Sequence, residues 1–109
     1  MYISFKNKKL SQTFNSEKEL EKAYGQLASP IRRRMAVLSG AMNLSMVPKE
    51  PLDRCHQLSG ARNGEFAVLL NKNFRLIFRP VEPVAKLEDG GINLKEVDTI
   101  LILSVEDYH

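Results

Sequence analysis

The sequence predicts an α+β fold, in which helices from the first half of the chain pack on strands from the second half. A helix-capping signal followed by a helical apolar stripe indicates helices in residues 16–42. Two alternating runs in residues 66–79 and a dense Ile, Leu and Val run in residues 99–105 indicate strands. With 109 residues, 43% of them hydrophobic, the chain is expected to form one domain over residues 1–109.

The N-terminal region predicts a short strand and then helices. Residues 1–5 alternate apolar and polar side chains, which suits a strand. Ser16 and Glu19 have the spacing of a capping box, so a helix is expected to begin near residue 16. Ser29 and Pro30 are expected to act as the N-cap and first-turn proline of a second helix, or to kink one continuous helix.

One apolar stripe should face the core from the second helix. It consists of Ile31, Met35, Leu38 and Met42, which recur at helical intervals. Pro48 and Pro51 are expected to end the helical region, because neither can occupy a helix interior.

A β-hairpin is predicted in the middle of the second half. Residues 66–70 and 74–79 alternate around the turn-like segment 71–73. The two-residue period places Arg75 and Arg79 on one face, so the phenylalanine face should pack on the helices.

The C-terminal part should contain a long loop and a last strand. Residues 80–98 hold two prolines and a Gly-Gly pair, which predicts an irregular loop. Residues 99–105 are expected to form a central strand covered on both sides, which carries residues 106–109 at its end.

Charge is distributed unevenly along the chain. The net charge is +3, yet residues 1–64 contain 11 Lys and Arg against 5 Asp and Glu, whereas residues 65–109 contain 5 against 8. This asymmetry suggests a basic face for phosphates or for an acidic partner, although an unevenly charged solvated surface would give the same count.

Cofactor sites and membrane spans are not predicted. Cys55, His56 and His109 are the only Cys and His residues, and a closed zinc site needs four ligands. Cys55 and His56 would point to opposite faces of an extended segment, so Cys55 is expected to be a buried thiol. No glycine-rich nucleotide loop, signal peptide or long apolar run is visible, so we expect a cytosolic protein without cofactor or membrane contact.

A set of polar residues matches the needs of a metal-independent ribonuclease. Such an enzyme needs a base, an acid and cations that stabilise the charge on the phosphorane. The candidates are His56, Arg62, Arg75, Arg79, Asp107, Tyr108 and His109. Each also has a structural explanation, because strand arginines can be solvated, a tyrosine can pack and an isolated histidine is more often structural than catalytic.

Three motifs in order resemble the HigB-type toxins of the RelE/ParE superfamily. They are residues 54–68 (RCHQLSGARNGEFAV), residues 73–79 (NFRLIFR) and residues 105–109 (VEDYH). The EDGGI loop at residues 88–92 further resembles a subgroup called killer proteins.

This resemblance implies a type II toxin with a RelE-like, microbial-ribonuclease-like fold, in which N-terminal helices pack on a small, twisted, mainly antiparallel sheet. It implies cleavage of mRNA in the ribosomal A site, and control by an antitoxin with a helix-turn-helix domain (HigA-like) that represses the shared operon on operator DNA. By motif, His56 and His109 become candidate acid and base groups, and Arg62 and Arg75 candidate phosphate ligands. Asp107 and Tyr108 become candidates for orienting or stacking, and Arg79 a lower-ranked phosphate ligand.

The chain departs from the family pattern at Ser59, where many members have a lysine. Serine lacks the charge and reach of lysine, which weakens phosphate stabilisation. Two non-enzymatic alternatives therefore stay open: a ParE-like protein that acts by binding, and a co-repressor that works with its antitoxin.

Overall fold

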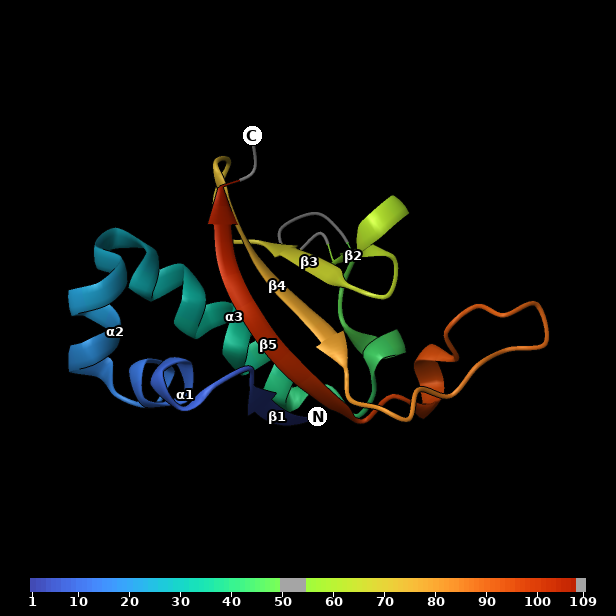
Figure 1. Ribbon diagram of the computed structural model, residues 1–109. Helices are drawn as coiled ribbons and strands as arrows, with labels where there is room; N and C mark the ends of the chain where they lie inside the picture. Colours follow the sequence, from blue (N-terminus) through green and yellow to red (C-terminus); the bar gives the residue numbers. More distant parts are fainter. Residues whose placement is uncertain (50–54, 108–109) are drawn as a thin grey trace.

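The computed structural model describes residues 1–49 and 55–107 (Figure 1). The helical elements are α1 (Lys8–Phe14), α2 (Glu17–Tyr24), α3 (Ala28–Gly40) and the 3-10 turns η1 (Gly25–Leu27), η2 (Leu44–Met46), η3 (Gly60–Arg62) and η4 (Leu94–Glu96). The strands are β1 (Tyr2–Phe5), β2 (His56–Gln57), β3 (Phe66–Leu69), β4 (Phe74–Pro80) and β5 (Thr99–Asp107).

The strands form one twisted sheet in the order β1-β5-β4-β3-β2 (Figure 1). Strand β1 runs parallel to β5, and every other neighbouring pair is antiparallel. The β1–β5 pairing joins residues near the two ends of the chain. The predicted mainly antiparallel sheet and the predicted hairpin, β3–β4, are therefore confirmed.

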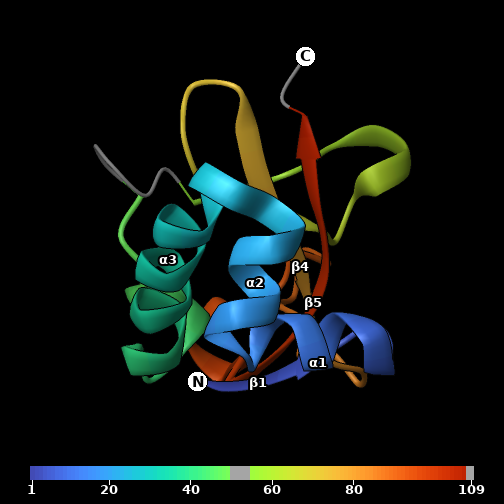
Figure 2. The ribbon, with the colours of Figure 1, turned by 90° about the vertical axis from the view of Figure 1, so that its left-hand side faces the viewer.

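The helices cover one face of the sheet, and Figure 2 shows them in front of it. Ile31 and Leu38 of α3 are fully buried against Leu76 and Phe78 of β4 in one core cluster. Phe66 stacks on Phe78 with ring centroids 5.6 Å apart. The phenylalanine face of the hairpin thus packs on the helix side, as its alternation predicts.

A one-residue bulge in β5 changes which side chains face the helices. Two neighbouring β4 residues pair with Ile102 and Ser104, so Leu103 is an extra residue of β5. Ile102 lies in the core before the bulge, and Val105 packs against the core after it. Ser104 and Glu106 therefore lie on the face opposite the helices, whereas uninterrupted alternation would direct both toward the core.

Two predictions for the helical region are wrong. Ser29 is not an N-cap, because Gly25 ends α2 with φ at 56° and the chain then stays helical through η1, so that α3 already begins at Ala28. Pro30 lies in the first turn, where its missing N–H is not needed. Helix α1 was not predicted from the sequence; Asn7 caps it through Leu10 N, but the helix has no buried residue to produce an apolar stripe.

Two burial predictions also need correction. Met42 lies beyond the end of α3 and is 78% exposed, because the chain becomes extended at Ala41; Leu44 is buried nearby instead. Strand β5 is covered fully on one side only, since Leu101 and Leu103 remain partly exposed. The helices cover a single face, so the other face of β5 is left for polar groups.

The two serines provide a direct stability test of helix capping. Ser16 Oγ accepts a hydrogen bond from Glu19 N at 3.2 Å, whereas Ser29 Oγ accepts only from the exposed Arg33 side chain. We expect Ser16→Ala to lower the free energy of unfolding by about 1 kcal/mol, because one helix N–H loses its acceptor. Ser29→Ala should change it by less than about 0.5 kcal/mol. Urea unfolding monitored by circular dichroism compares the two, and equal losses would contradict the assignment of Ser16 as the cap.

Candidate functional site

The candidate site lies on the sheet face opposite the helices, which we call the arginine face, formed by Arg75, Arg79, Ser104 and Glu106 with their neighbours. Arg75 of β4 pairs in register with Glu106 of β5, so their side chains leave the sheet on the same side. Ile77 lies between the two arginines of β4 and is fully buried. The charged side chains therefore lie beside an apolar centre.

Arg62 is the best-defined side chain of this face. Its Nη1 and Nη2 donate to Glu106 Oε1 and Oε2 at 2.7 and 2.8 Å, and its Nε donates to Glu65 Oε1 at 2.8 Å. Ser104 Oγ donates to the same Glu106 at 2.6 Å. The bidentate geometry joins η3, on the loop between β2 and β3, to the end of β5.

These contacts shift the protonation of both partners. The hydrogen bonds from Arg62 lower the pKa of Glu106 from 4.5 to about 2, with further contributions from Ser104 and from the charge of Arg75. The hydrogen bond to Glu106 likewise raises the pKa of Arg62. Glu106 is thus a permanent anion at neutral pH and is not suited to act as a general base.

The predicted phosphate ligands do not all come together. Arg62 and Arg75 both lie near Glu106, which carries their opposite charge. Arg79 lies four residues along β4 from Arg75, roughly 13 Å away, and its Nη1 donates to Pro80 O at 3.4 Å. The structure therefore separates Arg79 from the Arg62–Glu106–Arg75 cluster.

His56 lies on β2, two strands from β4, which corresponds to roughly 10 Å. It is exposed, whereas Cys55 is buried, so the two neighbours point to opposite sides as predicted. A cavity of about 240 Å³ beside them is also lined by Lys49. In the described ranges, no group of three or more His, Cys, Asp and Glu side chains is placed to hold a metal ion.

The C-terminal motif is described only in part. Asp107 is exposed and pairs with Phe74, a residue that packs on the core side, so its register places it on the face opposite Arg75. Tyr108 and His109 lie outside the described residues. The structure therefore leaves both as candidates from the sequence alone.

Sequence reasoning missed the carboxylates of this site. Glu106 was part of a quoted motif, yet Asp107 was chosen, because the bulge that brings Glu106 to the arginine face is not visible in the alternation of β5. Glu65 follows Arg62 by three residues, and that spacing was the one signal available for it.

Comparison with known proteins identifies the family. Residues 3–88 match a family model described as the RelE-like toxin of the type II toxin-antitoxin system HigB. The chain belongs to this family. It is a type II toxin of the RelE superfamily, which confirms the resemblance read from the motifs.

Individual relatives agree with this assignment. Toxin HigB-1 of Vibrio cholerae serotype O1 is 29% identical over 85 residues, which cover 78% of this chain and 90% of that protein. The fold is similar to YafQ from E. coli strain BL21(DE3), with a TM-score of 0.59, 10% identity and coverage of 97% and 91% of the two chains. It is also similar to the YoeB-YefM complex from Staphylococcus aureus, with a TM-score of 0.56, 16% identity and coverage of 100% and 97%. Within residues 1–49 and 55–107, no helix of the toxin has the length and hydrophobicity to cross a bilayer.

The ion pair of Glu106 predicts an acid-dependent loss of stability. Because its pKa is lowered on folding, folded Glu106 binds fewer protons than the unfolded chain between pH 4.5 and about pH 2, so its contribution is present above this window and is lost as the pH falls through it. We expect Glu106→Gln to be less stable than the wild type at pH 7, with a difference that shrinks as the pH falls from 5 to 2. Urea unfolding at a series of pH values measures this.

The exposed Glu82, which lies in the loop after β4, provides the control. Glu82→Gln should follow the wild type at every pH. A wild-type advantage over Glu106→Gln that stays constant from pH 7 to pH 2 would rule out the proposed linkage.

Proposed function

We propose that this toxin is a ribosome-dependent endoribonuclease that cleaves mRNA and thereby inhibits translation. The observation that carries the proposal is the position of Arg75 on the arginine face, beside a second arginine that is held rigidly by Glu106. A guanidinium fixed on a strand suits the charge of a phosphorane, because it stays ionised and can bridge two oxygens. Membership of the RelE superfamily supports the same reaction class.

The proposed reaction needs no metal. A base removes the proton of the 2′-hydroxyl, that oxygen attacks the phosphorus, and an acid protonates the leaving 5′-oxygen. We assign the acid and base roles to His56 and His109, with Asp107 and Tyr108 orienting or stacking on the substrate. Arg75 stabilises the charge that develops on the phosphate oxygens.

Arg62 is better suited to positioning than to direct phosphate binding. Three of its guanidinium nitrogens already donate to Glu65 and Glu106. A phosphate would have to displace Glu106, and the two carboxylates balance the charges of Arg62 and Arg75. We therefore rank Arg75 first as the phosphate ligand, and we assign Arg62 to holding η3 against β5.

A second function is favoured by the same ion pairs. With Arg62 neutralised and Ser59 in the place of a lysine, the site has fewer cations for phosphate than the family pattern provides. A toxin of this kind could act by binding alone, in the manner of a ParE-like protein, or as a co-repressor.

The partner is proposed to be an antitoxin encoded alongside the toxin. The YoeB-YefM complex of Staphylococcus aureus is a toxin-antitoxin complex of the same fold, which supports an antitoxin partner. We infer that this antitoxin is HigA-like, with a helix-turn-helix domain through which the toxin reaches operator DNA. Action on translating ribosomes would place the toxin in the cytoplasm. The β1–β5 pairing supports residues 1–109 as one toxin domain.

Primer extension on mRNA in a reconstituted translation reaction tests the nuclease. We expect cuts that appear only with translating ribosomes, and Arg75→Ala should reduce them roughly 100-fold or more, since it removes a charge that stabilises the transition state. Arg79→Ala is the matched control, because it removes the same side chain from the same strand outside the cluster, and it should reduce cleavage much less. His109→Ala should also abolish cleavage if His109 is the acid or base.

The same reaction separates the two candidate functions. Absence of cuts from well-folded wild-type toxin that still binds its antitoxin would favour the binding function. Equal losses in Arg75→Ala and Arg79→Ala would contradict the special role of Arg75.

A further inference from the structure

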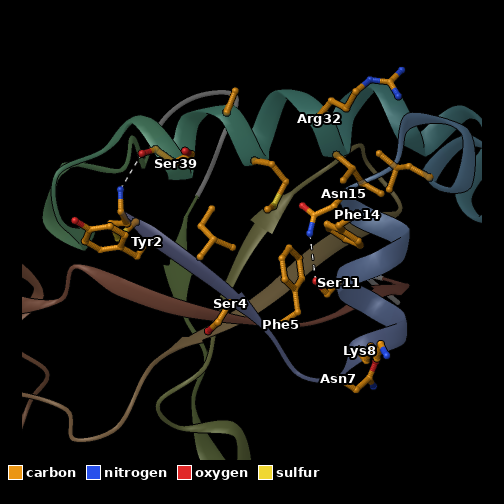
Figure 3. A pocket seen from close by; sticks show the side chains of 16 residues that line it. Tyr2, Ser4, Phe5, Asn7, Lys8, Ser11, Phe14, Asn15, Arg32 and Ser39 are labelled. Carbon is orange, nitrogen blue, oxygen red and sulfur yellow. Dashed lines mark hydrogen bonds between the residues drawn. The ribbon is translucent and has the colours of Figure 1, made fainter.

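A large groove lies on the helix side of the molecule, away from the arginine face. It runs along β1 between α1 and α3 and has a volume of about 1010 Å³ (Figure 3). Phe5 and Phe14 contribute an apolar wall, with ring centroids 5.5 Å apart, and Met35 of α3 lines the opposite side. The groove exists because α1 and α3 diverge over the first strand and leave it partly uncovered.

The floor of this groove is an edge strand with backbone groups directed away from the sheet. Tyr2 N and Lys6 N donate to carbonyl oxygens on the β5 side at 2.8 and 2.9 Å. Donors alternate along a parallel strand, so the N–H and C=O groups of Ile3 and Phe5 point to the other edge. Among the described residues, no strand pairs with that edge of β1. Such an edge is a template for a further strand.

The charges that line the groove have one sign. Lys8 of α1 and Arg32 of α3 contribute cations, and no Asp or Glu lies among its described lining residues. Arg32 Nη2 is 3.4 Å from Glu21 Oε1, while its Nη1 is buried with no hydrogen-bond acceptor among the described residues. A buried donor of this kind favours a ligand that brings a carboxylate.

We propose that this groove receives an extended segment of the antitoxin, which adds as a strand beside β1 and carries apolar side chains together with at least one carboxylate. The inference rests on the antitoxin partner of the proposed function. Ile3 and Phe5 each offer one N–H and one C=O to the incoming strand, the phenylalanine wall receives its apolar side chains, and Lys8 and Arg32 receive its carboxylates.

Other occupants fit less well. A second copy of the toxin at this edge would bring Lys6, Lys8 and Lys9 of both copies together, which like-charge repulsion opposes. An RNA strand would satisfy the cations, but it has no use for the backbone edge of Ile3 and Phe5. The acidic, extended protein segment uses all three features.

Adjacent lysines provide a matched charge test. Lys8 lines the groove, and Lys9 lies in the same first turn of α1 outside it. The probe is the purified antitoxin, the product of the gene encoded beside the toxin gene, titrated calorimetrically into full-length toxin. Lys8→Glu should weaken the Kd roughly tenfold or more, whereas Lys9→Glu should leave it within about twofold. Both variants place an acidic residue in a first turn, where it favours the helix, so folding should be retained.

Two exposed alanines provide a steric test with the same probe. Ala36 of α3 lines the groove and Ala23 of α2 does not, so Ala36→Trp should block antitoxin binding and Ala23→Trp should not. Hydrogen exchange gives an independent readout: the amides of Ile3 and Phe5 should become protected in the complex. Both results together would support strand addition at β1.

Each other outcome overturns a distinct statement. Unchanged antitoxin affinity in Lys8→Glu and Ala36→Trp would place the antitoxin elsewhere and leave the proposed function standing. Failure of the wild-type toxin to bind the antitoxin would overturn both the groove assignment and the proposed partner. Self-association on sedimentation that Ala36→Trp abolishes, with antitoxin affinity unchanged, would assign the groove to a second copy. Loss of affinity for a labelled single-stranded RNA in Lys8→Glu alone would assign the groove to RNA.

Discussion

The bulge at Leu103 is the constraint on which both faces of this toxin depend. Strand β5 is shared by the core and the candidate site, and it pairs with β1 on one side and β4 on the other. Without the extra residue, the alternation that buries Ile102 would turn Glu106 into the apolar core as well, at the cost of burying a charge. The bulge lets one strand supply apolar residues to the helix side along its length and still present Ser104 and Glu106 to the arginines.

The ion pair that the bulge permits is important mainly for geometry. Its side chains are about one-third exposed, so solvent screens the attraction and the pair adds little to global stability. The two parallel hydrogen bonds nevertheless fix the direction of the Arg62 guanidinium and hold η3 beside the end of β5. The same contacts commit the charge of Arg62 to carboxylates, which leaves Arg75 as the arginine of the cluster best placed to meet a phosphate.

The parts of this structure that were predictable from sequence are those with local causes. Ser16 caps α2 because its hydroxyl reaches an amide three residues away, and the hairpin alternates because each of its strands lies between the core and the arginine face. Ser29 carried the same local signal but was overruled by the helical conformation that the chain enters after Gly25. Glu106 was missed for a non-local reason, since only the pairing of β5 with β4 reveals the bulge. The three motifs gave the family, but they could not show that Arg62 is held by two carboxylates.

The sheet separates the two surfaces that a toxin of this family needs. The groove over β1 lies on the helix side at one edge, and Arg75 lies on the opposite face two strands away, roughly 10 Å across the sheet. A short strand added beside β1 would therefore extend the sheet without covering Arg75. Neutralisation by a partner bound there must come from the rest of that partner, either as a body that folds over the arginine face or as bulk that keeps the toxin out of a confined substrate site. Attachment and inhibition are then distinct contributions of the antitoxin, because the surface that gives affinity is not the surface that performs the chemistry.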